Sequence, residues 1–429
     1  MPEPGWRILV VGQGGREHAL VQSLAASPHV TTVYCAPGNP GTAQCATNVP
    51  IGAEDLDRLV DWAIAKDVDF VVVGPEAPLV AGLVDHLEAA GIPAFGPTMA
   101  GARLEASKAY AKTLMAKACI PTAPFRVVST LADAITAIDA LIGPTGIVIK
   151  ADGLAAGKGV IVADTREEAL IAAETMLSGR FGEAGRTLVI EGRLSGPEAS
   201  LIAIVDGTHY RAFPLVRDHK RLNDGDAGPN TGGMGVVTLS DVPASEQAAL
   251  AEHILTPLLT TLREAGITYC GVIFAGLLKS ETGWQVLEFN CRFGDPEAQV
   301  LLGAMQGDLA VLLDAAIRGR LATVPFVVDD RTRVCVVAAA PGYPEQPRKG
   351  TIIRHLPATD GVQLFHAGTG YDPAGDLIVT GGRVLNIVAE APDLNQARQK
   401  VYDALAPIRF GDALPHYRTD IGLPGGRAE

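Results

Sequence analysis

The stretch Arg7-Ile8-Leu9-Val10-Val11-Gly12-Gln13-Gly14-Gly15-Arg16 decides the fold of the N-terminal part of this chain. Its short apolar run ends in glycines, and a helical pattern follows from about Glu17. This arrangement is typical of a buried parallel strand that turns tightly into a helix. Apolar runs continue to alternate with helices up to about residue 100, which predicts a parallel sheet with helices on both faces. The further expected elements are strands at 32–35, 70–73 and 92–95 and helices at 55–66 and 79–90.

The carboxyl ends of these strands are the expected place for ligands, because open α/β sheets bind them there. Three polar or glycine-rich segments occupy those ends: Gly12–Arg16, Ala36–Asn39 and Gly74–Glu76.

Beyond residue 100 the pattern changes from regular alternation to mixed α+β units, so we expect an α/β and α+β multidomain protein. A helix carrying Lys108 is expected from Leu104 towards Pro121, and the last α+β unit is expected to begin near Arg331. The other expected features are a compact α+β unit at about 125–194, a mainly antiparallel sheet at 198–290 with a helix near 245–265, and hairpins at 206–207 and 281–283. We divide the chain into 1–107, 108–328 and 329–429.

The composition is that of a packed soluble protein with an excess of negative charge. Of the 429 residues, 48% are hydrophobic and 19% are charged, and the net charge is −13. That charge disfavours nucleic-acid binding, and no uninterrupted apolar run is long enough for a membrane span. The N-terminus lacks the layout of a signal peptide and the six cysteines contain no C-x-x-C pair, so we expect reduced thiols in a cytoplasmic protein.

The first glycine-rich loop, Gly12–Glu17, invites comparison with dinucleotide-binding loops but fails their fingerprint. Glu17 occupies the third glycine position, and no acidic residue follows the second strand. A nicotinamide site is therefore not expected. The glycine-rich start of a helix still suits one phosphate, with Arg16 adding positive charge, and a plain strand-to-helix turn is the alternative.

The second glycine-rich loop, Gly153–Gly159, is close to a P-loop without being one. Its glycine spacing is one residue short, and Gly159 stands where a P-loop has Ser or Thr. Lys150 and Lys158 can still offset the charge of a polyphosphate that approaches the glycine backbone; a plain hairpin loop is the alternative. A third polar, glycine-rich stretch lies between Asp218 and Gly235, and its length favours a functional or a disordered loop.

The stretch Val286–Glu297 carries the residues that point most directly to chemistry. Glu288 and Asn290 are two apart, so on a strand both side chains share one face. Carboxylate and amide oxygens suit a hard cation such as Mg²⁺. Arg292 can hold a carboxylate or phosphate at two points. A sheet edge with outward polar residues is the plain alternative.

Taken together, these motifs resemble those of the phosphoribosylamine–glycine ligase (glycinamide ribonucleotide synthetase) family within the ATP-grasp superfamily. The resemblance runs nearly from end to end of the chain. Any single motif is shared among ATP-grasp ligases, but the set in this order is specific. The matching segments are 11–20, 73–80, 150–160, 218–221, 228–235 and 288–297.

The resemblance implies an N-terminal α/β domain, an ATP-grasp domain with a mobile flap at about 125–194, and a small α+β C-terminal domain. It also implies ATP, Mg²⁺ or Mn²⁺, glycine and 5-phosphoribosylamine as ligands. The implied reaction is the second step of de novo purine synthesis. It forms glycinamide ribonucleotide, ADP and phosphate through glycyl phosphate and requires no protein nucleophile.

Roles for individual residues follow from the matched motifs. The ATP-binding set is Lys108, Lys150, Gly157, Lys158, Gly159, Glu191, Leu194 and Glu198. The substrate-binding set is Gly14, Gly15, Glu76, Asp218 and Lys220, with Arg292 at the glycine carboxylate or its acyl phosphate. The metal ligands are Glu288 and Asn290, and the catalytic set is Arg292, Lys150 and Asp218. The chain departs from the family pattern at Gly192, Arg193 and Pro40, and the first two put side-chain assignments at the adenine hinge in doubt.

Two alternatives remain at this point: another ATP-grasp carboxylate–amine or carboxylation ligase, and a nucleotide-binding regulatory protein without catalysis. The opening glycine motif and Asp218–Arg221 favour the glycine ligase over the first. The intact metal pair and both nucleotide lysines argue against the second. The expected partners are small molecules, with neither nucleic acid nor membrane, and the expected state is a monomer in transient contact with other purine-pathway enzymes.

Overall fold

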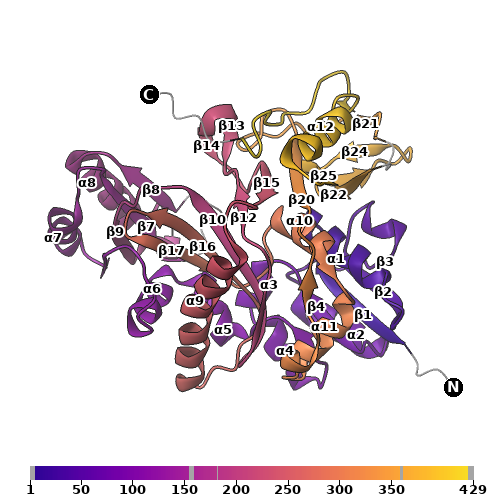
Figure 1. Ribbon diagram of the computed structural model, residues 1–429, viewed down its shortest axis with the longest axis horizontal. Helices are drawn as coiled ribbons and strands as arrows, with labels where there is room; N and C mark the ends of the chain where they lie inside the picture. Colours follow the sequence, from indigo (N-terminus) through magenta and orange to yellow (C-terminus); the bar gives the residue numbers. More distant parts are fainter. Residues whose placement is uncertain (1–4, 154–158, 181, 358–360, 424–429) are drawn as a thin grey trace.

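The protein is described by a computed structural model that covers residues 5–153, 159–180, 182–357 and 361–423. Figure 1 shows the N-terminal sheet at the right and a smaller α+β unit projecting to the left. Long strands of a central sheet lie between them, and the C-terminal elements lie above the N-terminal sheet.

The N-terminal sheet is parallel, which confirms the prediction from its alternating apolar runs. Ile8, Leu9, Val10 and Val11 are fully buried, as expected of a strand covered on both faces. The strand order is β3-β2-β1-β4-β5, so the topology reverses between β1 and β4. The strands are β1 (Trp6–Gly12), β2 (Val30–Pro37), β3 (Thr47–Asn48), β4 (Phe70–Val73) and β5 (Ala94–Phe95), and the first two helices are α1 (Gly15–Ala25) and α2 (Leu56–Ala65).

Two helices that the sequence pattern predicts as continuous are each broken in two. The pattern at 79–90 forms α3 (Glu76–Val80) and α4 (Leu83–Ala89), with Gly82 between them at φ +90°. A left-handed residue ends a helix, and glycine adopts it without strain. The segment after residue 98 forms α5 (Met99–Ala106) and α6 (Lys108–Lys117), because Ser107 caps the second helix by accepting from the backbone N–H of Tyr110 at 3.0 Å.

The α+β unit expected at 125–194 is a four-stranded antiparallel sheet of its own, with strand order β6-β9-β7-β8. Its helices pack on the sheet through Ile138, Ala172 and Met176, all buried. The elements are β6 (Phe125–Val128), α7 (Leu131–Leu141), β7 (Ile147–Ala151), β8 (Val160–Ala163), α8 (Arg166–Thr175) with a π-helical turn at Met176–Arg180, a 3-10 turn at Gly182–Gly185, and β9 (Leu188–Gly192).

The central sheet does not stop at the predicted boundary near residue 329. Strand β15 of its first half pairs with β20, so strands of the C-terminal part continue the same sheet. The order is β17-β16-β10-β12-β15-β20-β25-β22, with β11 beside β10. The strands are β10 (Glu198–Asp206), β11 (Tyr210–Ala212), β12 (Val216–Asp218), β15 (Gly235–Thr238), β16 (Cys270–Ser280), β17 (Gly283–Asn290), β20 (Thr332–Ala339), β22 (Val362–His366) and β25 (Arg383–Ala391).

Helices cover this sheet on both sides. Helix α9 (Ala244–Glu264) packs Leu255 and Leu258 into the core that contains β10 and β16, while α10 (Glu297–Ala304) and α11 (Leu309–Ile317) join the core that contains α1. Helix α12 (Leu394–Leu405) covers the C-terminal strands through Val401. Short ladders complete the fold: β13 (Arg221–Asn223) with β14 (Ala227–Asn230), β18 (Met305–Gln306) with β19 (Val327–Val328), β21 (Ile353–Arg354) with β26 (Arg409–Phe410), and β23 (Thr369–Tyr371) with β24 (Leu377–Val379).

A buried histidine joins α1 to the C-terminal strands. Nδ1 of His18 accepts a hydrogen bond from the backbone N–H of His366 at 2.9 Å, and its ring meets Phe365 edge-on. Burial and the neighbouring His366 lower the pKa of His18 to about 3. Burial also lowers the pKa of His366 to about 4, so both rings are neutral at pH 7.

We expect the melting temperature to fall as the pH is lowered from 6.5 towards 3. The unfolded chain binds a proton at His18 near pH 6.5 and the folded chain only near pH 3, so acid favours the unfolded state across that window. Each pH unit there removes about 1.4 kcal/mol of stability per histidine. His18→Gln should flatten the slope, whereas His86→Gln, at an exposed position, should leave it unchanged. A flat wild-type profile over this window contradicts the prediction.

Candidate active site

Strand β17 presents Glu288 and Asn290 on one face, as their spacing predicts. Glu288 lies opposite Gly276 on β16, and Asn290 lies opposite Phe274. A bulge at Leu287 shifts the register, so that Val286 and Phe289 both reach the core although they are three apart.

Glu288 is the acidic centre of a group of cations that come from different elements. Burial alone would raise the pKa of its carboxyl, but Lys220, Lys150, Lys108 and Arg292 outweigh burial and lower it. Glu288 is therefore ionised at neutral pH. The structure thus gathers four predicted site residues around one predicted metal ligand.

One of these cations, Lys150, belongs to a buried ion-pair group in which one carboxylate binds two lysines. Glu191 on β9 pairs with Lys150 through one oxygen and with Lys112 through the other, and all three side chains are buried. Lys112 also donates to Oγ1 of Thr122 at 2.6 Å, and Thr122 donates to the carbonyl of Val286 at 2.6 Å. The side chain of Glu191 is therefore occupied by the two lysines.

Lys112 belongs to this buried group, and the sequence argument missed it. It lies four residues after Lys108 on α6, so both side chains point to one side of the helix. The four-residue spacing of Lys108 and Lys112 is the sequence signal from which Lys112 could have been predicted.

The start of α6 fixes Lys108 against the second glycine loop. Asp152 accepts from the backbone N–H of Ala109 at 3.0 Å and from Ser107 at 3.1 Å, while Nζ of Lys108 donates to the carbonyl of Gly153 at 3.0 Å. Gly159, at the other end of the loop, is buried and its carbonyl accepts from Ala151. Gly157 and Lys158 lie outside the described residues.

Arg292 links β17 to the N-terminal domain. Its Nε lies 3.1 Å from Glu76 and its Nη2 lies 3.0 Å from Glu105, while Nη1 donates to the carbonyl of Phe293 at 3.4 Å. Burial tends to raise the pKa of Glu76, but Arg292 and Arg16 lower it overall. Glu105, which also accepts from the backbone N–H of Cys291, carried no sequence signal.

The C-terminal domain contributes Arg383, a second residue without a local sequence signal. Its Nη1 donates to the carbonyl oxygens of Gly232, at 2.6 Å, and of Asp295, and its Nη2 lies 3.5 Å from the Asp295 carboxylate. Arg383 therefore holds the third glycine-rich stretch against the loop that follows β17. That stretch forms the β13–β14 ladder, so the disordered alternative is excluded.

The start of α1 differs from the simple phosphate site that its glycines suggest. The backbone N–H of Gly14 donates to Glu17 at 2.6 Å, and Glu17 also pairs with Arg16 at 2.5 Å. A side chain at Gly15 would collide with Asn386 of β25. The carboxylate of Glu17 thus already satisfies part of this helix start. Gly15 faces Asn386 of the C-terminal part, whereas Gly14 faces Glu17 and Asp295.

Three further residues of the predicted nucleotide and substrate sets are placed by their own contacts and connections. Lys220 pairs with Glu198 at 2.8 Å, so the acid expected to face the ribose lies next to the lysine expected on the phosphoribosylamine side. Leu194 lies in the connection between β9 and β10. Arg193 pairs with Asp164 at 2.5 Å and donates to the carbonyl of Thr145, so its side chain is used within the four-stranded unit.

The donor set fits a divalent metal bound together with a polyphosphate. Glu288 is ionised and Asn290 offers a neutral oxygen on the same face. The described residues contain no cluster of three or more His, Cys, Asp or Glu that would hold a metal without help from a ligand. Two oxygen ligands supplemented by phosphate oxygens is the usual arrangement for Mg²⁺.

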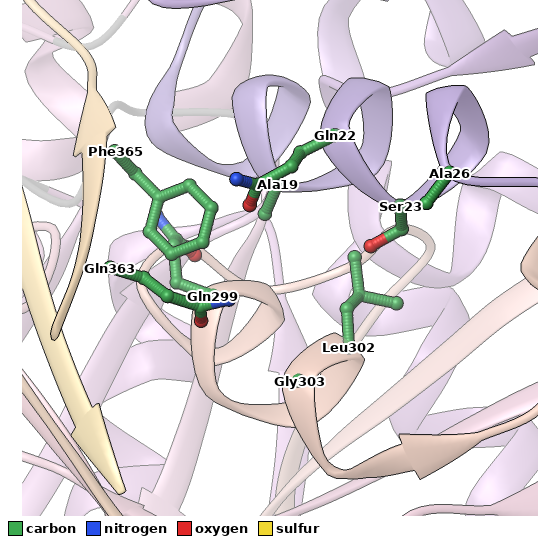
Figure 2. Close-up of a pocket in the computed structure, with 9 residues that line it drawn as sticks. All are labelled: Ala19, Gln22, Ser23, Ala26, Gln299, Leu302, Gly303, Gln363 and Phe365. Atoms are coloured by element: carbon green, nitrogen blue, oxygen red, sulfur yellow. The ribbon is translucent and has the colours of Figure 1, made fainter. Parts of the chain in front are cut away.

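A separate small cavity of about 190 Å³ lies between α1, α10 and β22. Figure 2 shows Gln363 and Phe365 of β22 on one side, Gln299 and Leu302 of α10 below, and α1 above. Its lining is uncharged, and the predicted site residues do not line it.

The fold and the lysine–carboxylate site define an ATP-grasp enzyme, a class of ATP-dependent ligase. Residues 6–105, 106–298 and 333–424 match, in that order, the N domain, the ATP-grasp (A) domain and the C domain of phosphoribosylglycinamide synthetase. The chain belongs to the phosphoribosylglycinamide synthetase family, which confirms the resemblance inferred from its motifs.

Relatives of known name agree over nearly the whole length. The chain is 45% identical over 420 residues to the phosphoribosylamine–glycine ligase of Brucella melitensis, covering 97% of each. It is 47% identical over 422 residues to that of Ralstonia nicotianae, covering 97% of this chain and 98% of the relative.

Solved structures show the same fold. A phosphoribosylamine–glycine ligase from Thermotoga maritima is 32% identical with a TM-score of 0.84, covering 96% of this chain and 99% of that one. A biotin carboxylase from Campylobacter jejuni is 15% identical with a TM-score of 0.72, covering 94% and 91%, and this likeness concerns the fold alone.

Lys112→Met should destabilise the protein by about 3–5 kcal/mol, because it breaks a buried pair and leaves Glu191 with one cation. Lys117→Met on the same helix breaks an exposed pair with Glu264 and should change stability by no more than about 0.5 kcal/mol. Denaturant unfolding of both variants measures the difference. Equal stabilities would show that the Lys112–Glu191 pair does not support the site.

Proposed function

We propose that this protein joins glycine to 5-phosphoribosylamine with the cleavage of ATP to ADP and phosphate, forming glycinamide ribonucleotide in the second step of de novo purine synthesis. Membership of the family and the names of its relatives support this assignment. The observation that carries it is the group of four cations around the ionised Glu288, which suits a polyphosphate and a metal.

The chemistry explains why such a site is needed. A carboxylate does not react with an amine at neutral pH, because its oxygen is a poor leaving group. The glycine carboxylate therefore attacks the γ-phosphorus of ATP, forming an O–P bond and releasing ADP. The amine of phosphoribosylamine then attacks the acyl carbon of glycyl phosphate, the C–O bond breaks, phosphate leaves, and the nitrogen loses a proton.

Protein groups supply position and charge compensation in both steps. Lys108 and Lys150 would bind the ATP phosphates, and Glu288 and Asn290 would hold the metal, which when bound neutralises developing phosphate charge. Arg292 would orient the glycine carboxylate. Its Nη1 bond to Phe293 is long at 3.4 Å, so an incoming carboxylate can replace it.

The finer assignments belong to the same proposal. Backbone groups from Glu191 to Leu194 would hold adenine, with Gly157, Lys158 and Gly159 covering the phosphates and Glu198 facing the ribose. Gly14, Gly15, Glu76, Asp218 and Lys220 would line the phosphoribosylamine side, where Asp218 joins Lys150 and Arg292 in the catalytic set. We also propose division at 107/108 and 328/329, a flap at 125–194 that closes over ATP, and either Mg²⁺ or Mn²⁺ as the metal.

The proposed setting is a cytoplasmic monomer that acts on small molecules and makes transient contacts with other enzymes of the pathway. The six cysteines are free thiols, which suits a reducing compartment. No helix within the described residues is long and apolar enough to cross a membrane.

The direct test is phosphate release from ATP with glycine and phosphoribosylamine added singly and together. Release only when both are present is the expected result, since the acyl phosphate needs one substrate to form and the other to be consumed. Release dependent on bicarbonate instead would identify a carboxylating ligase. No release under any combination would favour a regulatory nucleotide-binding protein.

Glu288→Ala and Arg292→Ala should each reduce turnover by at least about 100-fold, since each removes a charge from the reacting centre. Neither side chain lies in an apolar core, so the overall fold should survive, but Arg292→Ala should lower the melting temperature because it leaves Glu76 and Glu105 without their cation. Circular dichroism and melting temperature check the fold, and Lys279→Ala, which removes an exposed pair with Glu246, provides the control. Near-normal turnover in either site variant contradicts the assignment.

A further inference from the structure

The hairpin formed by β13 and β14 has almost no apolar packing. Its residues from 221 to 230 are exposed to solvent, with only Leu222 half-buried. A two-stranded hairpin of this kind is marginally stable at best when nothing else holds it. It nevertheless follows directly on Asp218, the last residue of β12, and on Lys220. The groups that hold the hairpin therefore also determine where the backbone of Lys220 lies.

Polar contacts from residues 416–422, which we call the C-terminal strap, hold the hairpin. The backbone N–H of Thr419 donates to Asp224 in the hairpin turn at 2.7 Å. Figure 1 shows this part of the chain beside β13 and β14. Two further contacts run from Nε2 of His416 to the carbonyl of Leu222 at 2.9 Å and from the backbone N–H of Gly225 to Asp420 at 2.8 Å.

Arg418 is the central side chain of the C-terminal strap, and it is only 1% exposed. Its guanidinium donates to both oxygens of Asp420 at 2.7 and 2.6 Å and to Asp226 in the hairpin turn at 2.7 Å. It also donates to the carbonyl of Arg221, in the first strand of the hairpin, at 3.2 Å. A planar guanidinium holds several oxygens at fixed angles, so Arg418 fixes both the turn and the first strand.

Lys220 lies between two residues that the C-terminal strap holds. On one side is Arg221, whose carbonyl accepts from Arg418. On the other side is the buried His219, whose Nε2 accepts from the backbone N–H of Gly422 at 3.2 Å. Burial and the positive charge of Arg418 lower the pKa of His219 to about 4, so the ring is neutral at pH 7 and can accept this bond. The strap therefore contacts the chain immediately before and immediately after Lys220.

The C-terminal strap is itself firmly attached to the C-terminal strands and to α12. His416 exchanges two backbone hydrogen bonds with Ala339 of β20, at 2.8 and 2.9 Å. Arg398 of α12 donates to the carbonyl of Thr419 at 2.9 Å, and Ile421 is fully buried in the core beneath α12. The strap therefore connects a packed part of the protein to a hairpin that has no core of its own.

We infer that Arg418 is a positioning residue of the reaction, which acts through the β13–β14 hairpin to place Lys220. The inference rests on the proposed function, which assigns Lys220 to the phosphoribosylamine side. Arg418 itself touches no reacting group. A displacement of about 1 Å in a substrate-binding group can cost about 100-fold in rate, so the position of this backbone matters for turnover. The C-terminal part thereby contributes to catalysis through the strap.

The kinetic test compares Arg418→Met with Arg333→Met. Arg333 is a matched control, because it is 3% exposed and pairs with Asp329 and Glu390, but within the described chain it forms no hydrogen bond or ion pair with the hairpin. Both variants should have a lower melting temperature. Only Arg418→Met should raise the KM for phosphoribosylamine, by about 10-fold or more, with the KM values for ATP and glycine within about twofold of wild type. Equal rises in all three KM values, or the same rise in both variants, overturn the inference.

A milder variant, Asp226→Asn, tests the same contact if Arg418→Met does not fold. The Asp226 side chain is 55% exposed, and asparagine tolerates its φ of +53°, so the fold should persist. The KM for phosphoribosylamine should rise by about 2- to 5-fold, the size of a partly exposed ion pair. Amide hydrogen exchange should become faster at residues 221–231 and stay unchanged in β1.

An unchanged KM for phosphoribosylamine in every variant that folds overturns the inference, whether or not hydrogen exchange in the hairpin becomes faster. Wild-type protein that fails to turn over glycine and phosphoribosylamine overturns the proposed function instead.

Discussion

The loop that follows β17 depends on three arginines from three parts of the chain, and the site depends on that loop. Arg16 of α1 donates to the carbonyl of Phe293 at 2.9 Å, Arg292 reaches Glu76 and Glu105, and Arg383 of β25 donates to the carbonyl of Asp295. A buried guanidinium must be paired and hydrogen-bonded to be tolerated, so each arginine also fixes the groups around it. The N-terminal, central and C-terminal parts are thereby joined at the place where the substrates are proposed to meet.

The requirement that buried charges be paired also fixes the lysines at the proposed ATP site. Lys150 and Lys112 share Glu191, and Lys108 is directed by Asp152 and Gly153 at the start of α6. These cations have only partial compensation from protein carboxylates, with Glu288 as the common acidic neighbour. A polyphosphate with its metal would complete the charge balance, and the positions of the lysines are set before it arrives. Pre-positioned charge of this kind is what makes electrostatic catalysis effective.

The features that could be predicted from the sequence are those set by the geometry of neighbouring residues. The spacing of Glu288 and Asn290 predicts their common face, and the runs from Ile8 to Phe95 predict the parallel sheet. Two misses had a local signal: Lys112 lies one helical turn after Lys108, and Glu17 occupies the capping position three residues after Gly14. Glu105 and Arg383 had none, because their partners lie 187 and 88 residues away. The breaks at Gly82 and Ser107 were missed because helical periodicity continues across them.

The pairing of β15 with β20 has a mechanical consequence. A sheet that is hydrogen-bonded without interruption from β17 to β22 resists internal rotation, so the C-terminal strands cannot swing as a separate body. Strands β6 to β9 form a different sheet, joined to the rest of the chain through the segments 118–124 and 193–197. The proposed closure over ATP would therefore be a rotation of that small sheet about these two short connections. The hydrogen bond from Lys150 to the carbonyl of Leu287, at 3.3 Å, joins the small sheet to the central sheet and would have to break in such a rotation.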